Sequence, residues 1–148
     1  MEPPLQTAFD ADDPRSARRA AAQVLTDWGL GPVVADAELV VAELTANAAF
    51  HGGGITGIRL AYDRGRLRVE VADRSPDAPR SAAPAAGTGG RGLRIVSALS
   101  SEWGWSPRNR GKVVWAELAL PAPDPDPGLG ISPATTAVPS AAEQPARR

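Results

Sequence analysis

Apolar residues recur every three or four positions in three stretches of the chain, which is the spacing of one face of an α-helix. These stretches are residues 13–30, 32–52 and 92–104. In the first, Asp13 stands where an N-cap residue belongs, and Pro14 follows at the first helical position. Each stretch has a glycine near one of its ends, where a helix starts or stops. The pattern predicts three helices.

Between and after these stretches, apolar and polar residues alternate, which is typical of half-buried β-strands. Residues 57–63 and 66–73 alternate on either side of an Arg-Gly pair, and residues 101–109 and 111–120 do so around an Asn-Arg-Gly turn. Each pair predicts a hairpin. Because helices and antiparallel strands come in blocks, we expect an α+β fold. It would be a two-layer sandwich with helices on one face of a mixed, mostly antiparallel sheet.

The composition divides the chain into three parts. Residues 121–148 hold seven of the fifteen prolines and few large apolar side chains, which predicts a disordered tail. Residues 1–6 are expected to be a flexible N-terminus. The folded domain would therefore cover residues 7–120, with a long loop of small residues at 74–90.

Several classes of function are disfavoured by composition. The chain has no cysteine and a single histidine, His51, which excludes thiol chemistry and sites with several histidines. The formal net charge of −1 gives no general attraction to nucleic acid. No segment approaches the ~20 apolar residues of a membrane span. We therefore expect a cytoplasmic protein with neither nucleic acid nor membrane as a direct partner.

The second helix carries a polar stripe. Glu43, Asn47 and His51 follow one another at intervals of four, so they would lie along one side of the helix. The other side carries apolar residues and is predicted to be buried: Leu39, Val40, Leu44 and Ala48. The stripe could be an ordinary solvated surface, with His51 favoured by the helix dipole. It could also face a ligand.

Two further features suggest a ligand when taken with the stripe. Asp73 ends a strand, where its carboxylate could accept a hydrogen bond from an exocyclic amine such as that of adenine. It could equally form a local Asx-turn. Glycines at 87, 89, 90 and 92 lead into the third helix, whose N-terminus could bind phosphate, with Arg91 in reach. A flexible hinge is the alternative for these glycines. Together the three features are the parts of an ATP site.

Their order and residues resemble the histidine-kinase-type ATPase superfamily. Within it, the chain is most similar to small single-domain ATP-binding regulators of high-GC bacteria related to anti-sigma factor serine/threonine kinases. The resemblance covers about residues 7–120. It rests on "VVAELTANAAFHG" as the N-box, "VEVADRSPDAP" as the G1 box, and "GGRGLRIVSALSSEWGW" with "GKVVWAEL" as the G2 box and closing strand.

The resemblance implies a role for each matching residue. Asn47 would be the Mg²⁺ ligand, Glu43 the general base and Asp73 the adenine-reading carboxylate. Residues 77–90 would be a flexible ATP lid. The nucleotide would be held by the residues that match the family's contacts: Asn47, His51, Asp73, Gly90, Arg91, Gly92 and Leu93.

The chain departs from the family pattern in two places. The G1 box lacks the two glycines that usually follow its aspartate, so the adenine pocket would be closed differently. Where many members place a threonine on the last strand, this chain offers Val114 and Trp115.

The resemblance implies a kinase that binds ATP and Mg²⁺. It would phosphorylate a serine on a small antagonist protein, and hold a sigma factor when that antagonist is absent. Two alternatives stay open: a nucleotide-gated binding protein without useful transfer, and an interaction module that has lost ATP. A homodimer through the first helix or an exposed sheet edge is also possible.

Overall fold

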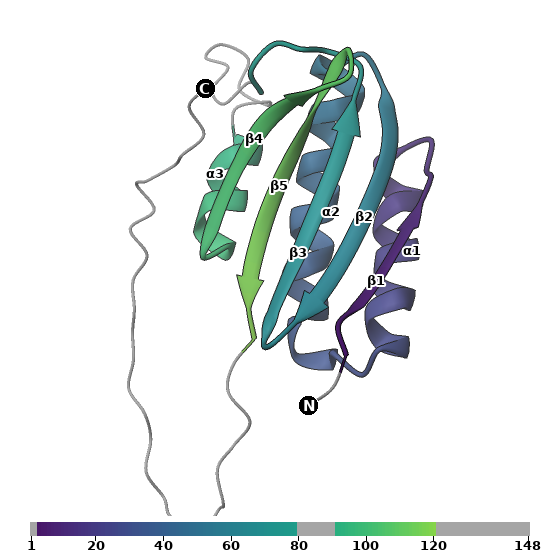
Figure 1. The fold of residues 1–148 in the computed structure, drawn as a ribbon, viewed down its shortest axis with the longest axis vertical. Helices are drawn as coiled ribbons and strands as arrows, with labels where there is room; N and C mark the ends of the chain where they lie inside the picture. Colours follow the sequence, from purple (N-terminus) through teal and green to yellow (C-terminus); the bar gives the residue numbers. More distant parts are fainter. Residues whose placement is uncertain (1–2, 80–90, 121–148) are drawn as a thin grey trace, which may run out of the picture.

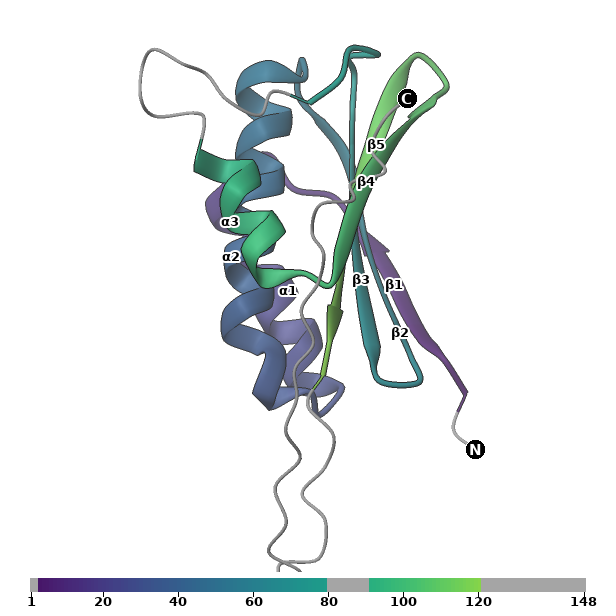
Figure 2. The ribbon, with the colours of Figure 1, turned by 90° about the vertical axis from the view of Figure 1, so that its left-hand side faces the viewer.

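Five strands and three helices form two layers in the part of the chain that the computed structural model describes, residues 3–79 and 91–120 (Figure 1). All three helices lie on one face of the sheet (Figure 2). The elements are β1 (Leu5–Phe9), α1 (Pro14–Asp27), α2 (Gly31–His51), β2 (Ile55–Asp63), β3 (Arg66–Asp73), α3 (Arg91–Leu99), β4 (Glu102–Arg108) and β5 (Gly111–Ala119). The expected α+β class is confirmed.

The strand order is β1-β2-β3-β5-β4, and every pair of neighbours is antiparallel. The sheet is therefore antiparallel throughout rather than mixed. The two predicted hairpins account for two of the four pairings. Arg64 and Gly65, between β2 and β3, both have positive φ, as a two-residue turn of type I′ requires. Asn109 takes a positive φ in the turn between β4 and β5.

One strand, β1, was not predicted. It pairs with β2 from Leu5↔Tyr62 to Phe9↔Ile58, so residues 5 and 6, expected to be flexible, belong to the sheet. The segment is only five residues long, which is too short for its alternation to indicate a strand. The partner that holds β1 in place is about fifty positions further along the chain. Residues 1–2 and the predicted tail, residues 121–148, lie outside the described residues.

The start of α1 agrees with the sequence. Asp13 is the N-cap, and its side chain accepts a hydrogen bond of 2.8 Å from the Ser16 backbone N–H. That hydrogen bond holds the pKa of Asp13 below its ordinary value. The helix ends at Asp27, and Gly29 follows with a positive φ of 79°.

The core lies between the three helices and the inner face of the sheet. Val40, Leu44 and Ala48 are buried as expected. Leu39 is not: it is 45% exposed. A helix turns by a full circle in 3.6 residues, so neighbouring residues point in quite different directions. Val40 takes the inward position, and Leu39 points away from the sheet. None of the helices in the described ranges is at once long enough and apolar enough to span a bilayer.

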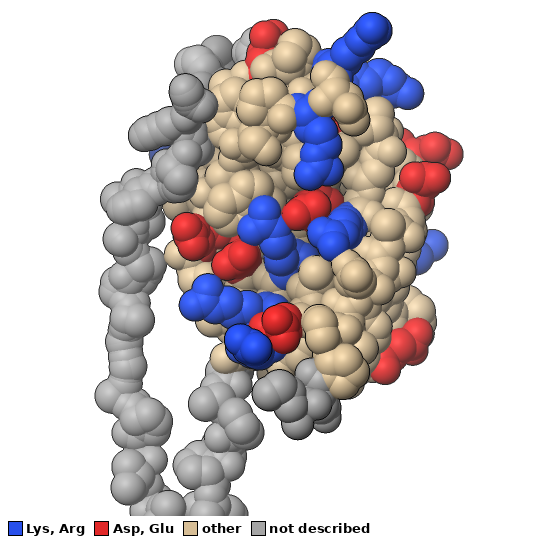
Figure 3. Space-filling model, in the orientation of Figure 1, with Lys and Arg blue, Asp and Glu red and all other residues tan. Residues whose placement is uncertain are grey.

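The face of the sheet without helices carries charged residues in its middle (Figure 3). Arginines and glutamates form ion pairs there, at 2.8–3.6 Å: Arg68–Glu70 lies within β3, and the other three join neighbouring strands, namely Arg59–Glu70, Arg66–Glu117 and Arg68–Glu117. The guanidinium of Arg68 also lies 4.3 Å from the centre of the Trp115 ring. Two glutamates thus offset most of the charge of three arginines on this part of the sheet.

Gly111 begins β5 where it passes closest to the end of β3. A Cβ placed there would overlap the carbonyl oxygen of Asp73, which is backbone and has little room to move. We expect Gly111→Ala to lower the free energy of unfolding by roughly 1–3 kcal/mol, as overpacking does elsewhere. Urea denaturation measures this.

Gly57→Ala is the matched control, since a Cβ there meets nothing within 4 Å. Equal denaturation midpoints for the two variants would contradict the close contact between β3 and β5.

Candidate functional site

The C-terminal end of α2, the end of β3 and the start of α3 all lie at the same end of the molecule (Figures 1 and 2). A hydrogen bond of 2.9 Å from the Arg74 N–H to the Gly52 carbonyl joins the residues that follow α2 and β3. The fold therefore brings together the polar stripe, the strand-end carboxylate and the helix N-terminus, three features that are well separated in the sequence.

The stripe lies on the outer part of α2. Glu43 and Asn47 are half-buried, one helical turn apart, and His51 is exposed in the last turn. On the buried side, the Thr45 hydroxyl donates to the Val41 carbonyl at 2.6 Å and is satisfied within the helix. Glu43 and Asn47 therefore lie half-buried along one side of α2, and the Oδ1 atom of Asn47 is itself enclosed by the protein.

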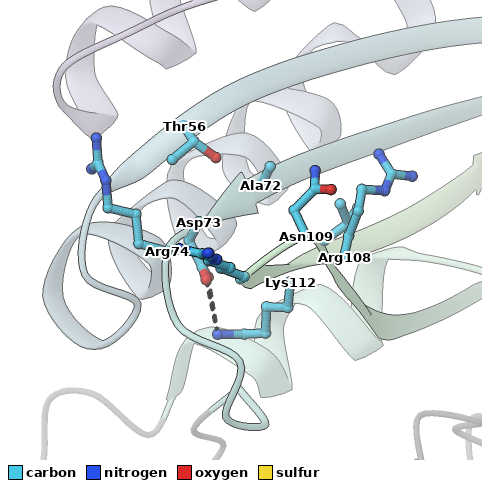
Figure 4. A pocket seen from close by; sticks show the side chains of 10 residues that line it. Thr56, Ala72, Asp73, Arg74, Arg108, Asn109 and Lys112 are labelled. Atoms are coloured by element: carbon cyan, nitrogen blue, oxygen red, sulfur yellow. Dashed lines mark hydrogen bonds and ion pairs between the residues drawn. The ribbon is translucent and has the colours of Figure 1, made fainter.

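Asp73 and Lys112 form a buried ion pair (Figure 4). The Lys112 Nζ lies 2.9 Å from Oδ2 and 3.2 Å from Oδ1 of Asp73, and the two side chains are only 2% and 1% exposed. The residues are register partners on β3 and β5. Two buried charges at this depth are tolerated because each neutralises the other.

The Asp73 carboxylate makes further contacts with its own chain. Its Oδ1 accepts a hydrogen bond of 2.9 Å from the Ser75 N–H, which is the Asx-turn considered from the sequence. Lys112 Nζ donates to the Ser75 carbonyl at 3.4 Å. Gly52 lies against the carboxylate so closely that a Cβ there would overlap Oδ2. A ligand amine at Asp73 would have to share the carboxylate with Lys112.

Lys112 was missed as a site residue. The sequence offers one signal: it is the only lysine in the chain, and it occupies an inward position of β5 in series with Val114 and Ala116. Val114 belongs to the core and Trp115 to the opposite face, so Lys112 is the β5 residue beside Asp73.

The glycine run is only partly described. Gly90 lies outside the described residues, as do residues 80–90 of the expected lid. Arg91 and Gly92 open α3. The Leu93 side chain is 4% exposed and packs in the hydrophobic core. The backbone of Leu93, rather than its side chain, is therefore left to contact a ligand.

A metal ion at this site would need oxygen ligands from the nucleotide that binds with it. In residues 3–79 and 91–120, no three or more His, Cys, Asp or Glu side chains gather into a metal-binding cluster. Mg²⁺ bound with a nucleotide takes one or two protein oxygens and completes its shell with phosphates and waters. The amide oxygen of Asn47 suits that role.

Three helices on one face of a five-stranded antiparallel sheet agree with the fold expected of a histidine-kinase-type ATPase domain. A family model described as "Histidine kinase-like ATPase domain" matches residues 7–118. The chain belongs to this family, which makes it an ATP-binding protein of the histidine kinase-like type. No curated protein matches it.

Proposed function

We propose that this protein is a serine/threonine kinase of the anti-sigma factor type. It binds ATP and Mg²⁺, phosphorylates a serine of a small antagonist protein, and holds a sigma factor in the cytoplasm when that antagonist is absent. The observation that carries the proposal is the placement of Glu43 and Asn47 one turn apart on one side of α2, a helix whose C-terminal end is hydrogen-bonded to the segment that follows Asp73.

The division of roles follows from the chemistry of the side chains. The Asn47 amide oxygen is a hard ligand suited to Mg²⁺. The Glu43 carboxylate lies on the same side and accepts the proton of the substrate serine hydroxyl. When bound, Mg²⁺–ATP supplies the phosphoryl group and the charge that neutralises its oxygens. His51, Arg91 and the start of α3 complete the polar surface around the phosphates.

Two side chains, rather than one, would recognise the adenine base of the nucleotide. Asp73 accepts from the exocyclic amine of adenine, and Lys112, 2.9 Å away, donates to the ring nitrogen beside that amine. The weakest of the Lys112 contacts, at 3.4 Å to the Ser75 carbonyl, is the one that a base would replace.

A nucleotide-gated binding protein without useful transfer is the second candidate. The observation that favours it is the engagement of Asp73 by Lys112 and Ser75, which leaves less of the carboxylate for adenine than a lone aspartate would offer. In either case, β1 and β4 leave sheet edges at which a second copy could pair to form a homodimer.

Calorimetric titration of the full chain with ATP, with and without Mg²⁺, tests the proposal. We expect metal-dependent binding that Asn47→Ala weakens roughly 10- to 100-fold, the effect of losing one interaction with a charged group. Asn109→Gly is the control: it removes the chain's other asparagine without straining a positive φ.

Each other outcome has a definite meaning. Equal affinities of the wild type and Asn47→Ala would remove Asn47 from the metal site. No binding by the wild type at millimolar ATP would overturn both candidates and leave an interaction module on an ATPase fold.

A further inference from the structure

A pocket of about 460 Å³ lies on the face of the sheet that carries no helices, at the same end as the Asp73–Lys112 pair (Figure 4). Its floor includes Ala72 and Val113, which are register partners on β3 and β5. Successive residues of a strand point to opposite faces. Ala72 and Val113 therefore face away from the helices, while the adjacent Asp73 and Lys112 face toward them. The pocket borders the candidate nucleotide site, because Asp73 and Lys112 also line it.

The rim of this pocket is cationic and polar. Arg74 comes from the segment after β3, and Arg108 and Arg110 from the end of β4 and the following turn. All three are exposed. Thr56 and Asn109 add a hydroxyl and an amide beside them (Figure 4). Three positive charges thus surround an apolar floor formed by two small side chains.

These arginines differ from the others on the same face. Elsewhere on the sheet, Arg59, Arg66 and Arg68 all pair with glutamates. At the pocket, no carboxylate of residues 3–79 or 91–120 lies within ion-pair distance of Arg74, Arg108 or Arg110. The Arg74 side chain donates to the Gly53 carbonyl, at 3.4 Å, rather than to a carboxylate. The positive charge of the rim is therefore not neutralised within the described fold.

We propose that this pocket binds an acidic segment of a partner protein, with carboxylates on the arginine rim and one apolar side chain on the floor. Arginine pairs with carboxylates through two parallel hydrogen bonds, which favours it at such contacts. A volume of about 460 Å³ exceeds the need of a single carboxylate and falls in the range of ligand sites. Because the floor is apolar, the bound segment must also supply an apolar side chain that packs on it.

A labelled synthetic peptide tests this proposal, with four Asp and Glu residues around a single leucine. We expect fluorescence anisotropy to show binding to the full-length protein, and Arg108→Ser with Arg110→Ser to weaken it about tenfold or more. The control is Arg18→Ser with Arg19→Ser on α1, which removes the same charge from exposed positions in the helix layer. Its affinity for the peptide should stay within about twofold of the wild type. Thermal denaturation of both double variants verifies that they are folded.

A third variant distinguishes binding of the peptide in the pocket from simple charge attraction. Ala72→Leu fills the floor without changing charge, so it should weaken binding of the leucine peptide more than that of a peptide with glycine in its place. Equal losses in the two arginine variants would overturn the proposal in favour of diffuse electrostatics. So would displacement of the peptide by inorganic phosphate or ATP at equal concentration, which would indicate a small-anion site. Absence of peptide binding to the wild type at millimolar concentration would also overturn it.

Discussion

Replacing Glu43 with glutamine is expected to lower the rate of phosphoryl transfer by about 10²- to 10⁴-fold, the usual contribution of a general base. Glutamine has nearly the same shape as glutamate but cannot accept the proton of the attacking hydroxyl. Glu43 lies on the half-buried outer side of α2, so the change leaves the packing of the core intact. ATP affinity should therefore change little, because the loss falls on the transition state alone.

Phosphate release from ATP measures this effect even before a protein substrate is identified, because water needs the same base when it replaces serine. Glu38→Gln is the matched control, as Glu38 is the other glutamate of α2 and is also half-buried. Unchanged turnover in Glu43→Gln would remove Glu43 from its role as base. A wild type that binds ATP but never turns it over would favour the nucleotide-gated candidate.

The second large effect concerns the fold. Lys112→Met is expected to reduce the free energy of unfolding by about 3–5 kcal/mol, because it leaves the Asp73 carboxylate buried without its cation. Methionine fills a similar volume, so the loss reflects charge rather than packing. Urea denaturation gives the value directly, and a denaturation midpoint equal to that of the wild type would show that the ion pair is not needed in the buried site.

A double variant distinguishes this explanation from a simple effect at position 112. Asp73→Asn combined with Lys112→Met removes both charges and keeps an oxygen that accepts from the Ser75 N–H. We expect it to recover most of the stability lost in Lys112→Met, since replacement of a whole buried pair by neutral groups is often nearly neutral. If the stability lost in the double variant equals the sum of the losses in Asp73→Asn and Lys112→Met, the two residues are not coupled in the way their distance of 2.9 Å indicates.

Much of the site was predictable because its parts are local. Glu43, Asn47 and His51 lie within three turns of a single helix, so their spacing alone places them along one side. Asp73 is the last residue of a strand with clear alternation, and its Asx-turn involves a residue only two positions away. The role of each as a nucleotide ligand came from the resemblance and stays a prediction.

The sequence by itself determined the elements whose signals are short-range: the Asp13 cap, the two hairpins, the three helices and the stripe on α2. Only the tertiary structure decided which residue meets Asp73. Lys112 is 39 positions away, and its contact depends on the register between β3 and β5. A shift of one residue would have turned Val113 inward and Lys112 outward. The same register places Ala72 and Val113 on the opposite face, beneath the three arginines. Strand register is set by burial and pairing across the whole sheet, and no local pattern contains it.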